Sequence, residues 1–226
     1  IVEWGRPPRR APREGRVIMD ACERIAEVEA RELTYSLLSR LFLEEVSEDF
    51  LSRLAEESLP LEGELGRYAA ELPGADLAAL RAEAAAEFAA LLLNMSADPV
   101  FPYESVYTSA EHLLMQRSRD EVLAAYRSQG FERSGELNVP EDHVGIELEF
   151  MARLCCKEAE ALAANDGAGV DAARVAQQDF LRDHLLVWIP QLCDDLEKRA
   201  KPGLYRGLAE TARQFLVFER EELGVG

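Results

Sequence analysis

The 226-residue chain lacks the sequence patterns of the common enzyme classes. It contains no phosphate-binding loop, no dinucleotide-binding glycine pattern, no nucleophile elbow and no His-Glu-x-x-His zinc pattern. No apolar run approaches the roughly 18 residues that are needed to cross a bilayer. We therefore expect a protein that is not an enzyme and is not stably inserted in a membrane.

Histidine and cysteine are also scarce, with three and four residues respectively. The cysteines form no Cys-x-x-Cys pair and have no ligand-like spacing to a histidine, which argues against a metal site. Reduced thiols are typical of a cytoplasmic protein. We predict a cytoplasmic location and no metal ion or other cofactor.

The sequence is poor in Val, Ile and Thr and rich in Ala, Leu, Glu and Arg, a composition that favours helix over strand. Its apolar periodicity predicts an all-α fold, a single compact bundle of about ten helices. In one expected helix, at 109–128, the apolar positions that should face the core are Leu113, Leu114, Val122, Leu123 and Tyr126. The other long segments are expected at about 20–43, 77–95 and 140–164.

Charge is distributed unevenly along the chain, which carries a net −18. Residues 1–18 contain five Arg and two Glu, a net +3, which leaves −21 for residues 19–226. Such an acidic body repels nucleic acid and anionic membranes and favours basic partners. Solubility alone is the simpler explanation of the same charge.

Composition also suggests how the chain is divided. Arg9-Arg10 is reminiscent of an export signal, but the acidic stretch after Met19 lacks the apolar run of about 7–15 residues that such a signal requires. A Gly-containing connection separates two helical halves and is a candidate hinge. The expected divisions are an irregular basic tail (1–18), an N-terminal helical half (19–129), the hinge or linker (130–139) and a C-terminal helical half (140–226).

Residues 138–147 combine a helix start with polar residues that a helix start does not require. Asn138 and Glu141 fit a capping box, and Pro140 is tolerated in a first turn. His143 is left unexplained, because a helix N-terminus disfavours its protonated form. On a helical wheel Glu147 falls in the apolar sector one turn from His143. We therefore hypothesise a polar pair of His143 and Glu147 at the edge of a groove.

An aromatic and proline-rich loop at 101–107 gives two further alternatives. Its side chains could simply cover the bundle, with Tyr103 and Tyr107 lying against it. They could instead form an apolar patch with the preceding helix, as in grooves that bind apolar peptide segments. The patch would combine Phe101, Pro102, Tyr103, Phe88, Leu91 and Leu92.

These two motifs resemble those of the TorD/DmsD family of redox-enzyme maturation chaperones. The resemblance lies in Phe-Pro-Tyr-Glu-Ser-Val-Tyr at 101–107 and Asn-x-Pro-Glu-Asp-His-Val-Gly at 138–145, and it extends over about 20–220. Tyr-x-Leu-Leu-Ser-Arg-Leu-Phe at 35–42, His184 and Trp188 also fit. The family pattern usually has Glu before the proline, where this chain has Val139, so Asp142 and His143 are the better candidates for the polar contacts.

The resemblance implies a cytoplasmic chaperone that binds the twin-arginine signal peptide, the immature body, or both, of a molybdopterin-dependent oxidoreductase. Such a chaperone assists cofactor insertion and prevents premature export. The resemblance implies a monomer or a domain-swapped dimer with 130–139 as its hinge. Guanine nucleotide binding is also linked to the family, but the absence of a phosphate-binding loop gives no reason to predict it. The implied peptide-binding residues are Glu141, Asp142, His143, Glu147, Tyr103, Pro102, Tyr107, Phe88, Leu91 and Leu92.

Two other functions are compatible with the residues alone. One is a generic α-helical scaffold or regulatory protein whose apolar patch is ordinary core and which has no peptide groove. The other, more remote, is an enzyme that uses Asp142 and His143. Binding of a signal peptide distinguishes the chaperone from the scaffold, and turnover without a client protein is required of an enzyme.

Overall fold

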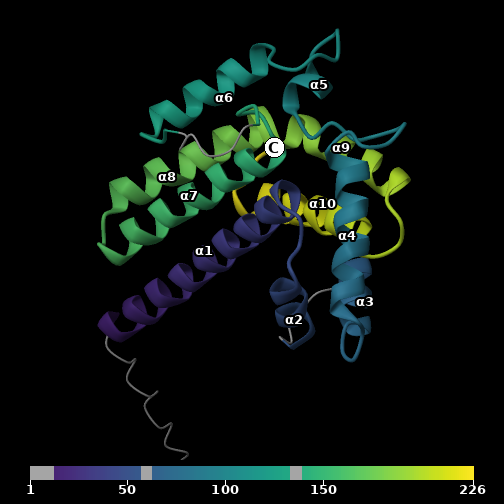
Figure 1. The fold of residues 1–226 in the computed structure, drawn as a ribbon. Coiled ribbons are helices and arrows are strands. Elements are labelled where there is room, and N and C mark those ends of the chain that lie inside the picture. Colours follow the sequence, from purple (N-terminus) through teal and green to yellow (C-terminus); the bar gives the residue numbers. More distant parts are fainter. Residues whose placement is uncertain (1–12, 57–62, 133–138) are drawn as a thin grey trace, which may run out of the picture.

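The computed structural model describes residues 13–56, 63–132 and 139–226, and every regular element in these ranges is a helix (Figure 1). The expected all-α fold is confirmed. Within the described ranges, strand-like pairing is limited to one isolated bridge between Tyr103 and His143. The elements are α1 (Arg13–Leu43), α2 (Glu48–Glu56), α3 (Gly63–Glu71), α4 (Leu77–Leu92), α5 (Glu104–Thr108), α6 (Arg117–Ser128), α7 (Val144–Ala163), α8 (Gly167–Phe180), the π-helical turn η1 (Leu181–Leu185), α9 (Leu186–Arg199) and α10 (Leu204–Glu222).

The two long helices α1 and α7 form the most extensive packing contact of the fold and run antiparallel (Figure 1). The end of α1 meets the start of α7, where the Ser39 hydroxyl donates a hydrogen bond of 2.6 Å to the Gly145 carbonyl oxygen. A Cβ at Gly145 would lie 2.9 Å from the Ser39 carbonyl oxygen and would overlap the Leu43 side chain. Glycine at this position is therefore what allows the two helices to approach so closely.

A buried ionic cluster joins α1 to three other helices. The Arg31 guanidinium binds both carboxylate oxygens of Glu219 on α10 at 2.7 Å, and it lies 3.4 Å from Glu158 on α7. It also donates to Gln177 of α8 at 2.6 Å, and Arg174 of α8 donates to Glu158 at 3.0 Å. We call this set the Arg31 cluster. It contains two guanidinium groups and two fully buried carboxylates, so its charges balance.

The two halves expected from the sequence share one core. Besides the α1–α7 contact, α10 packs against both α3 and α9, and a Cβ at Gly207 of α10 would lie 2.6 Å from the Leu65 nitrogen of α3. The hydrophobic core accordingly includes residues from both sides of the connection at 130–139. Residues 133–138 of that connection lie outside the described residues, and its role as a hinge stays a prediction.

Several helix boundaries differ from those expected, three of them with consequences for the fold. The first helix begins at Arg13 instead of about Asp20, directly after Pro12, so residues 13–18 are helical rather than part of an irregular tail. Of the helix expected at 109–128, only residues 117–128 (α6) are helical, and residues 109–116 connect this helix to α5. The helix expected at 140–164 begins at Val144.

The interruption at 109–116 has a tertiary cause. His112 and Met115 adopt positive φ angles of 52° and 58°, which an α-helix cannot accommodate. Contacts with α5 hold this conformation: His112 Nδ1 lies 2.7 Å from the Val106 carbonyl oxygen, and the Gln116 amide donates to Ser105 Oγ at 3.0 Å. As a result Leu113 and Leu114, expected in the core, are 56% and 43% exposed.

No described helix is long and apolar enough to cross a membrane.

Candidate functional site

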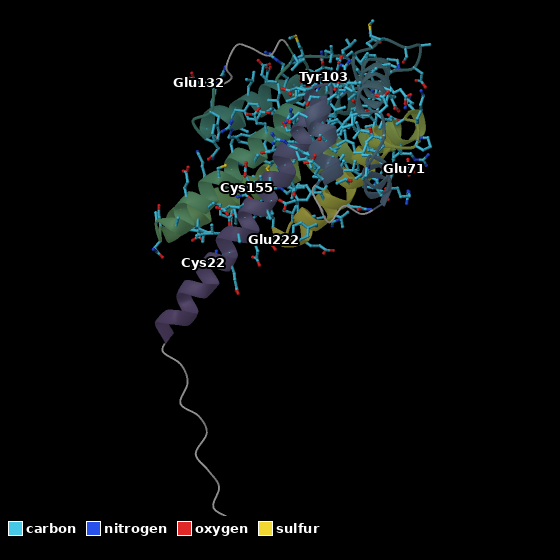
Figure 2. The ribbon with its side chains drawn as sticks, turned by 60° about the horizontal axis from the view of Figure 1, so that its bottom comes forward. Cys22, Glu71, Tyr103, Glu132, Cys155 and Glu222 are labelled. Carbon is cyan, nitrogen blue, oxygen red and sulfur yellow. The ribbon has the colours of Figure 1, made fainter. Side chains whose placement is uncertain are left out.

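The two motifs singled out in the sequence, at 101–107 and 138–145, meet in one unit. The Glu104 amide donates to the Asp142 carbonyl oxygen, and the Val144 amide donates to the Pro102 carbonyl oxygen, both at 2.9 Å. These bonds place α5 beside the start of α7. Figure 2 shows Tyr103 at the end of the molecule where α1 ends, with Cys22 toward the beginning of that helix.

Asp142 and His143 are buried within this unit, and both stabilise it. Asp142 Oδ2 accepts a hydrogen bond of 2.9 Å from the Ser105 amide at the start of α5. His143 is the N-cap of α7, because its Nδ1 accepts from the Gly145 amide at 3.1 Å. Burial lowers the pKa of His143 to about 3, so the ring is neutral and free to accept this bond.

The sequence therefore assigned the capping of this helix to the wrong residues. Capping accounts for His143 itself, whereas Glu141 forms an ion pair of 2.6 Å with Arg119 of α6. Asn138, the other expected capping residue, lies outside the described residues.

Glu147 is fully buried, as its place in the apolar sector indicated, but its partner is not His143. Glu147 Oε2 accepts a hydrogen bond of 3.0 Å from Trp188 Nε1 on α9. The His143 ring instead lies edge-on to Tyr103, with ring centres 5.1 Å apart. The hypothesised His143–Glu147 pair at a groove edge is thus not formed. Burial, followed by the nearby Glu104 carboxyl, raises the pKa of Glu147 well above its usual range.

The expected apolar patch is divided by the structure. Phe88, Leu91 and Leu92 of α4 belong to the core, where the Phe88 ring lies 6.0 Å from that of Tyr205. Pro102 is buried and Tyr103 is half-buried. The patch residues of α4 therefore face inward, from a helix that packs on the bundle.

An open groove of about 620 Å³ lies next to this unit, between the loop after α4, α5 and α9. Among the residues expected to bind a peptide, Tyr107 lines this groove. The groove also contains Phe101, which is 40% exposed, and Val106. The segments that line the groove also carry exposed large apolar side chains at neighbouring positions. These are Leu93, Met95, Leu113, Leu114 and Met115.

The charged residues of the groove leave a surplus of negative charge. Arg199 of α9 lies 3.0 Å from Asp98 in the loop after α4 and 3.1 Å from Asp195. Asp195 also accepts from the Tyr107 hydroxyl at 3.3 Å, which ties α5 to α9. Among the residues that line the groove, two carboxylates thus face one guanidinium, and the exposed Lys198, outside the lining, lies 3.7 Å from Asp195.

The backbone around the groove is locally strained. Four non-glycine residues in the described ranges have positive φ, and three of them, Asn94, His112 and Met115, lie in or next to the groove. Asparagine and histidine are enriched in this conformation, whereas methionine adopts it only when its surroundings impose it. Such strain is concentrated at functional sites in many proteins.

Sequence reasoning missed most of the groove. Asp98, Gln191, Asp195 and Arg199 were not expected at a site, because they come from two segments about a hundred residues apart. A usable signal was Leu-Asn-Met-Ser-Ala-Asp-Pro at 93–99, where apolar residues occur within a run of turn-forming residues. In the described part of the chain, the side chains that commonly bind metals form no group that could hold an ion.

The chain is similar to several known proteins. The sequence model of the family described as nitrate reductase delta subunit matches residues 54–194. A chaperone protein TorD from Vibrio cholerae is 33% identical over 208 residues, which cover 83% of this chain and 89% of the relative. Another TorD chaperone, from Photobacterium profundum, is 31% identical over 123 residues, covering 54% of this chain and 56% of the relative. A solved structure of a redox enzyme maturation protein from Archaeoglobus fulgidus aligns with a TM-score of 0.46 at 20% identity, covering 83% of this chain and 92% of that one.

Proposed function

Since this chain belongs to the family of TorD chaperones and nitrate reductase delta subunits, we propose that it is a cytoplasmic chaperone for a molybdopterin-dependent oxidoreductase. Its named relatives are chaperones and not catalysts, in agreement with the absence of enzymatic activity expected from the sequence. The client is the precursor of the oxidoreductase, held until its cofactor is inserted.

We further propose that the groove beside α5 binds the twin-arginine signal peptide of that precursor. The observation that carries this proposal is the combination in one groove of exposed apolar side chains and surplus carboxylates. A twin-arginine signal peptide has complementary chemistry, with two guanidinium groups followed by an apolar run. Asp142, His143 and Glu147 are buried behind the groove, and their part is to hold α5, and with it Tyr107, in position.

Calorimetric titration with a signal peptide tests the groove. Phe101→Ser and Leu114→Ser each remove apolar contact area, and we expect each to weaken binding about tenfold, corresponding to about 1.4 kcal/mol. Val175→Ser on α8 and Val217→Ser on α10 are controls, because these side chains are 53% and 55% exposed and lie on helices that do not line the groove. Phe101 lines the groove, and Leu114 lies in the segment that continues from it. Equal losses in all four variants would show that the groove is not the binding site.

Salt dependence tests the electrostatic part. A peptide held partly by its arginines should bind more weakly as salt is added, because exposed charges are screened. A peptide with both arginines replaced by glutamine should bind weakly at all salt concentrations and show little salt dependence. If neither peptide binds, the alternative of a scaffold without a peptide groove is favoured.

A further inference from the structure

A second group of buried polar side chains lies directly beneath α5. Glu104 of α5, Glu147 of α7, His184 of η1 and Trp188 of α9 come from four different elements, and all are buried. We call them the Glu104–Glu147 cluster. Tyr107, which lines the groove, packs on Trp188 with ring centres 5.5 Å apart, so the cluster lies immediately behind the groove wall.

The hydrogen bonds of this cluster determine where its protons are. His184 Nδ1 lies 3.0 and 3.2 Å from the two carboxylate oxygens of Glu104. A carboxylate can only accept, so Nδ1 carries the hydrogen and donates it. Trp188 Nε1 donates to Glu147 Oε2, as described above. Each glutamate therefore has one donor that comes from outside the pair.

The remaining contact joins the two glutamates. After burial itself, the charge of the nearby Glu104 carboxyl contributes most to raising the pKa of Glu147, so the two carboxyl groups lie close together. Two ionised carboxylates cannot hydrogen-bond to each other, because neither has a hydrogen to donate. Glu147 Oε1 is buried and receives no bond from an N–H or hydroxyl group of the described residues. A proton on this oxygen, donated to Glu104, satisfies both groups.

We propose that Glu104 and Glu147 share one proton, and that this proton holds α5 against α7 and α9 and so maintains the wall of the groove. Loss of the proton leaves two carboxylates side by side in a buried site, where their repulsion is strong. The five-residue α5 moves more easily than the twenty-residue α7, which packs along α1 and α8. The proposed displacement therefore carries Val106 and Tyr107 away from the groove.

The other titratable groups around the pair do not supply the missing proton. Asp142, which precedes α7, is a third acid: its Oδ2 accepts from the Ser105 amide, and its Oδ1 is buried without a hydrogen-bond partner among the described residues. Asp142 acts on Glu147 through its charge and not through a hydrogen bond. Burial raises the pKa of Tyr126 on α6, and its hydroxyl donates to the Glu141 carbonyl oxygen. His184 provides a route to solvent, because its ring also lines a pocket of about 180 Å³ together with Asp179 and Asp183.

The shared proton can be observed without any client. An infrared spectrum at neutral pH should contain the carbonyl band of a protonated carboxyl group. Glu147→Gln should remove the band, whereas Glu149→Gln, an exposed glutamate of the same helix, should leave it. Absence of the band, or its persistence in both Glu147→Gln and Glu104→Gln, would overturn the proposal. Either glutamine can donate in place of the proton, so one variant suffices if the other does not fold.

The effect of the shared proton on α5 can be measured separately. In a Trp4→Phe background Trp188 is the single tryptophan, and its emission should change as pH rises and the proton on Glu147 is lost. Glu147→Gln should abolish this change and Glu149→Gln should not. If the infrared band is present but the emission change is the same in Glu147→Gln, the link between the proton and α5 is refuted.

The consequence for peptide binding rests on the proposed function. Above the transition, each pH unit should lower the affinity of the signal peptide about tenfold, because the protonated fraction falls by that factor. Glu147→Gln should keep its affinity constant over the same range. A peptide that binds at no pH, together with a normal infrared band and Trp188 response, would reject the proposed function and leave the shared proton intact.

Discussion

The Arg31 cluster and the Glu104–Glu147 cluster are both buried polar groups that join four elements, yet they differ in charge balance. In the Arg31 cluster two guanidinium groups meet two carboxylates. In the Glu104–Glu147 cluster two carboxyl groups meet one histidine and one indole, with Asp142 as a further acid nearby. The first cluster needs no proton to be satisfied, whereas the second does.

This difference assigns the two regions different roles. A balanced and fully bonded ionic cluster is insensitive to pH near neutrality and holds α1, α7, α8 and α10 in one arrangement. A cluster with surplus acid depends on proton concentration, and it lies where the short helix α5 meets the groove. The rigid and the adjustable parts of the fold are thus distinguished by how their buried charges are neutralised.

Removing the central cation of the balanced cluster should have the largest effect. Arg31→Ala leaves Glu219 and Glu158 buried with fewer partners, and breaking a buried pair in this way costs about 3–5 kcal/mol. Urea unfolding at neutral pH measures the loss. A decrease below about 1 kcal/mol would contradict the view that this cluster fixes the four helices.

Glu147→Gln should remove the pH dependence of stability that Glu147 creates. The folded-state pKa of Glu147 is raised, so its stabilising contribution is complete below the unfolded pKa of about 4.3 and is lost as pH rises through the folded value. The wild type should lose up to about 1.4 kcal/mol per pH unit over that interval, and the variant should not. Parallel stability curves for the two proteins would refute this.

His143 should act in the opposite direction. Its folded-state pKa of about 3 lies below the usual 6.5, so its contribution is complete above about pH 6.5 and decreases as pH falls toward 3. His143→Ala should cost about 1 kcal/mol at neutral pH through loss of the cap, and His143→Asn should restore most of it. Thermal unfolding at neutral and mildly acidic pH distinguishes the cap from the titration, because the asparagine variant retains only the cap.

Removing an exposed ion pair should have the smallest effect on the free energy of unfolding. Arg153 and Glu149 are 3.1 Å apart on the solvent side of α7, in the i,i+4 arrangement. Arg153→Ala should change the free energy of unfolding by only about 0.2–0.5 kcal/mol, and less in high salt. A loss of stability comparable to that of Arg31→Ala would mean that burial does not determine how much an ion pair contributes to the free energy of unfolding.

Local features of the sequence predicted much of the fold correctly. Asp76 directly precedes the helix expected at about 77–95, and its carboxylate caps α4 by accepting from the Ala79 amide at 3.1 Å. Ser47 likewise accepts from the Phe50 amide at the start of α2. Glu147 was placed correctly in the apolar sector of α7. Each of these features depends on residues within one or two turns, where sequence spacing determines geometry.

The errors concern contacts that apolar periodicity does not reveal. Periodicity favoured one helix at 109–128, but contacts with Ser105 and Val106 hold residues 109–116 in a non-helical conformation. The assignment of Phe88, Leu91 and Leu92 to a binding surface failed because apolar periodicity does not tell a core face from a groove face.

By itself the sequence determined the helical class and the resemblance that placed the chain in its family, because composition, periodicity and motifs are properties of neighbouring residues. Only the tertiary structure decided that Asp142, His143 and Glu147 lie behind the groove and that Glu104 meets Glu147 and His184. The partners of Glu104 are more than 40 residues away along the chain, so their contact depends on helix packing and not on any local pattern.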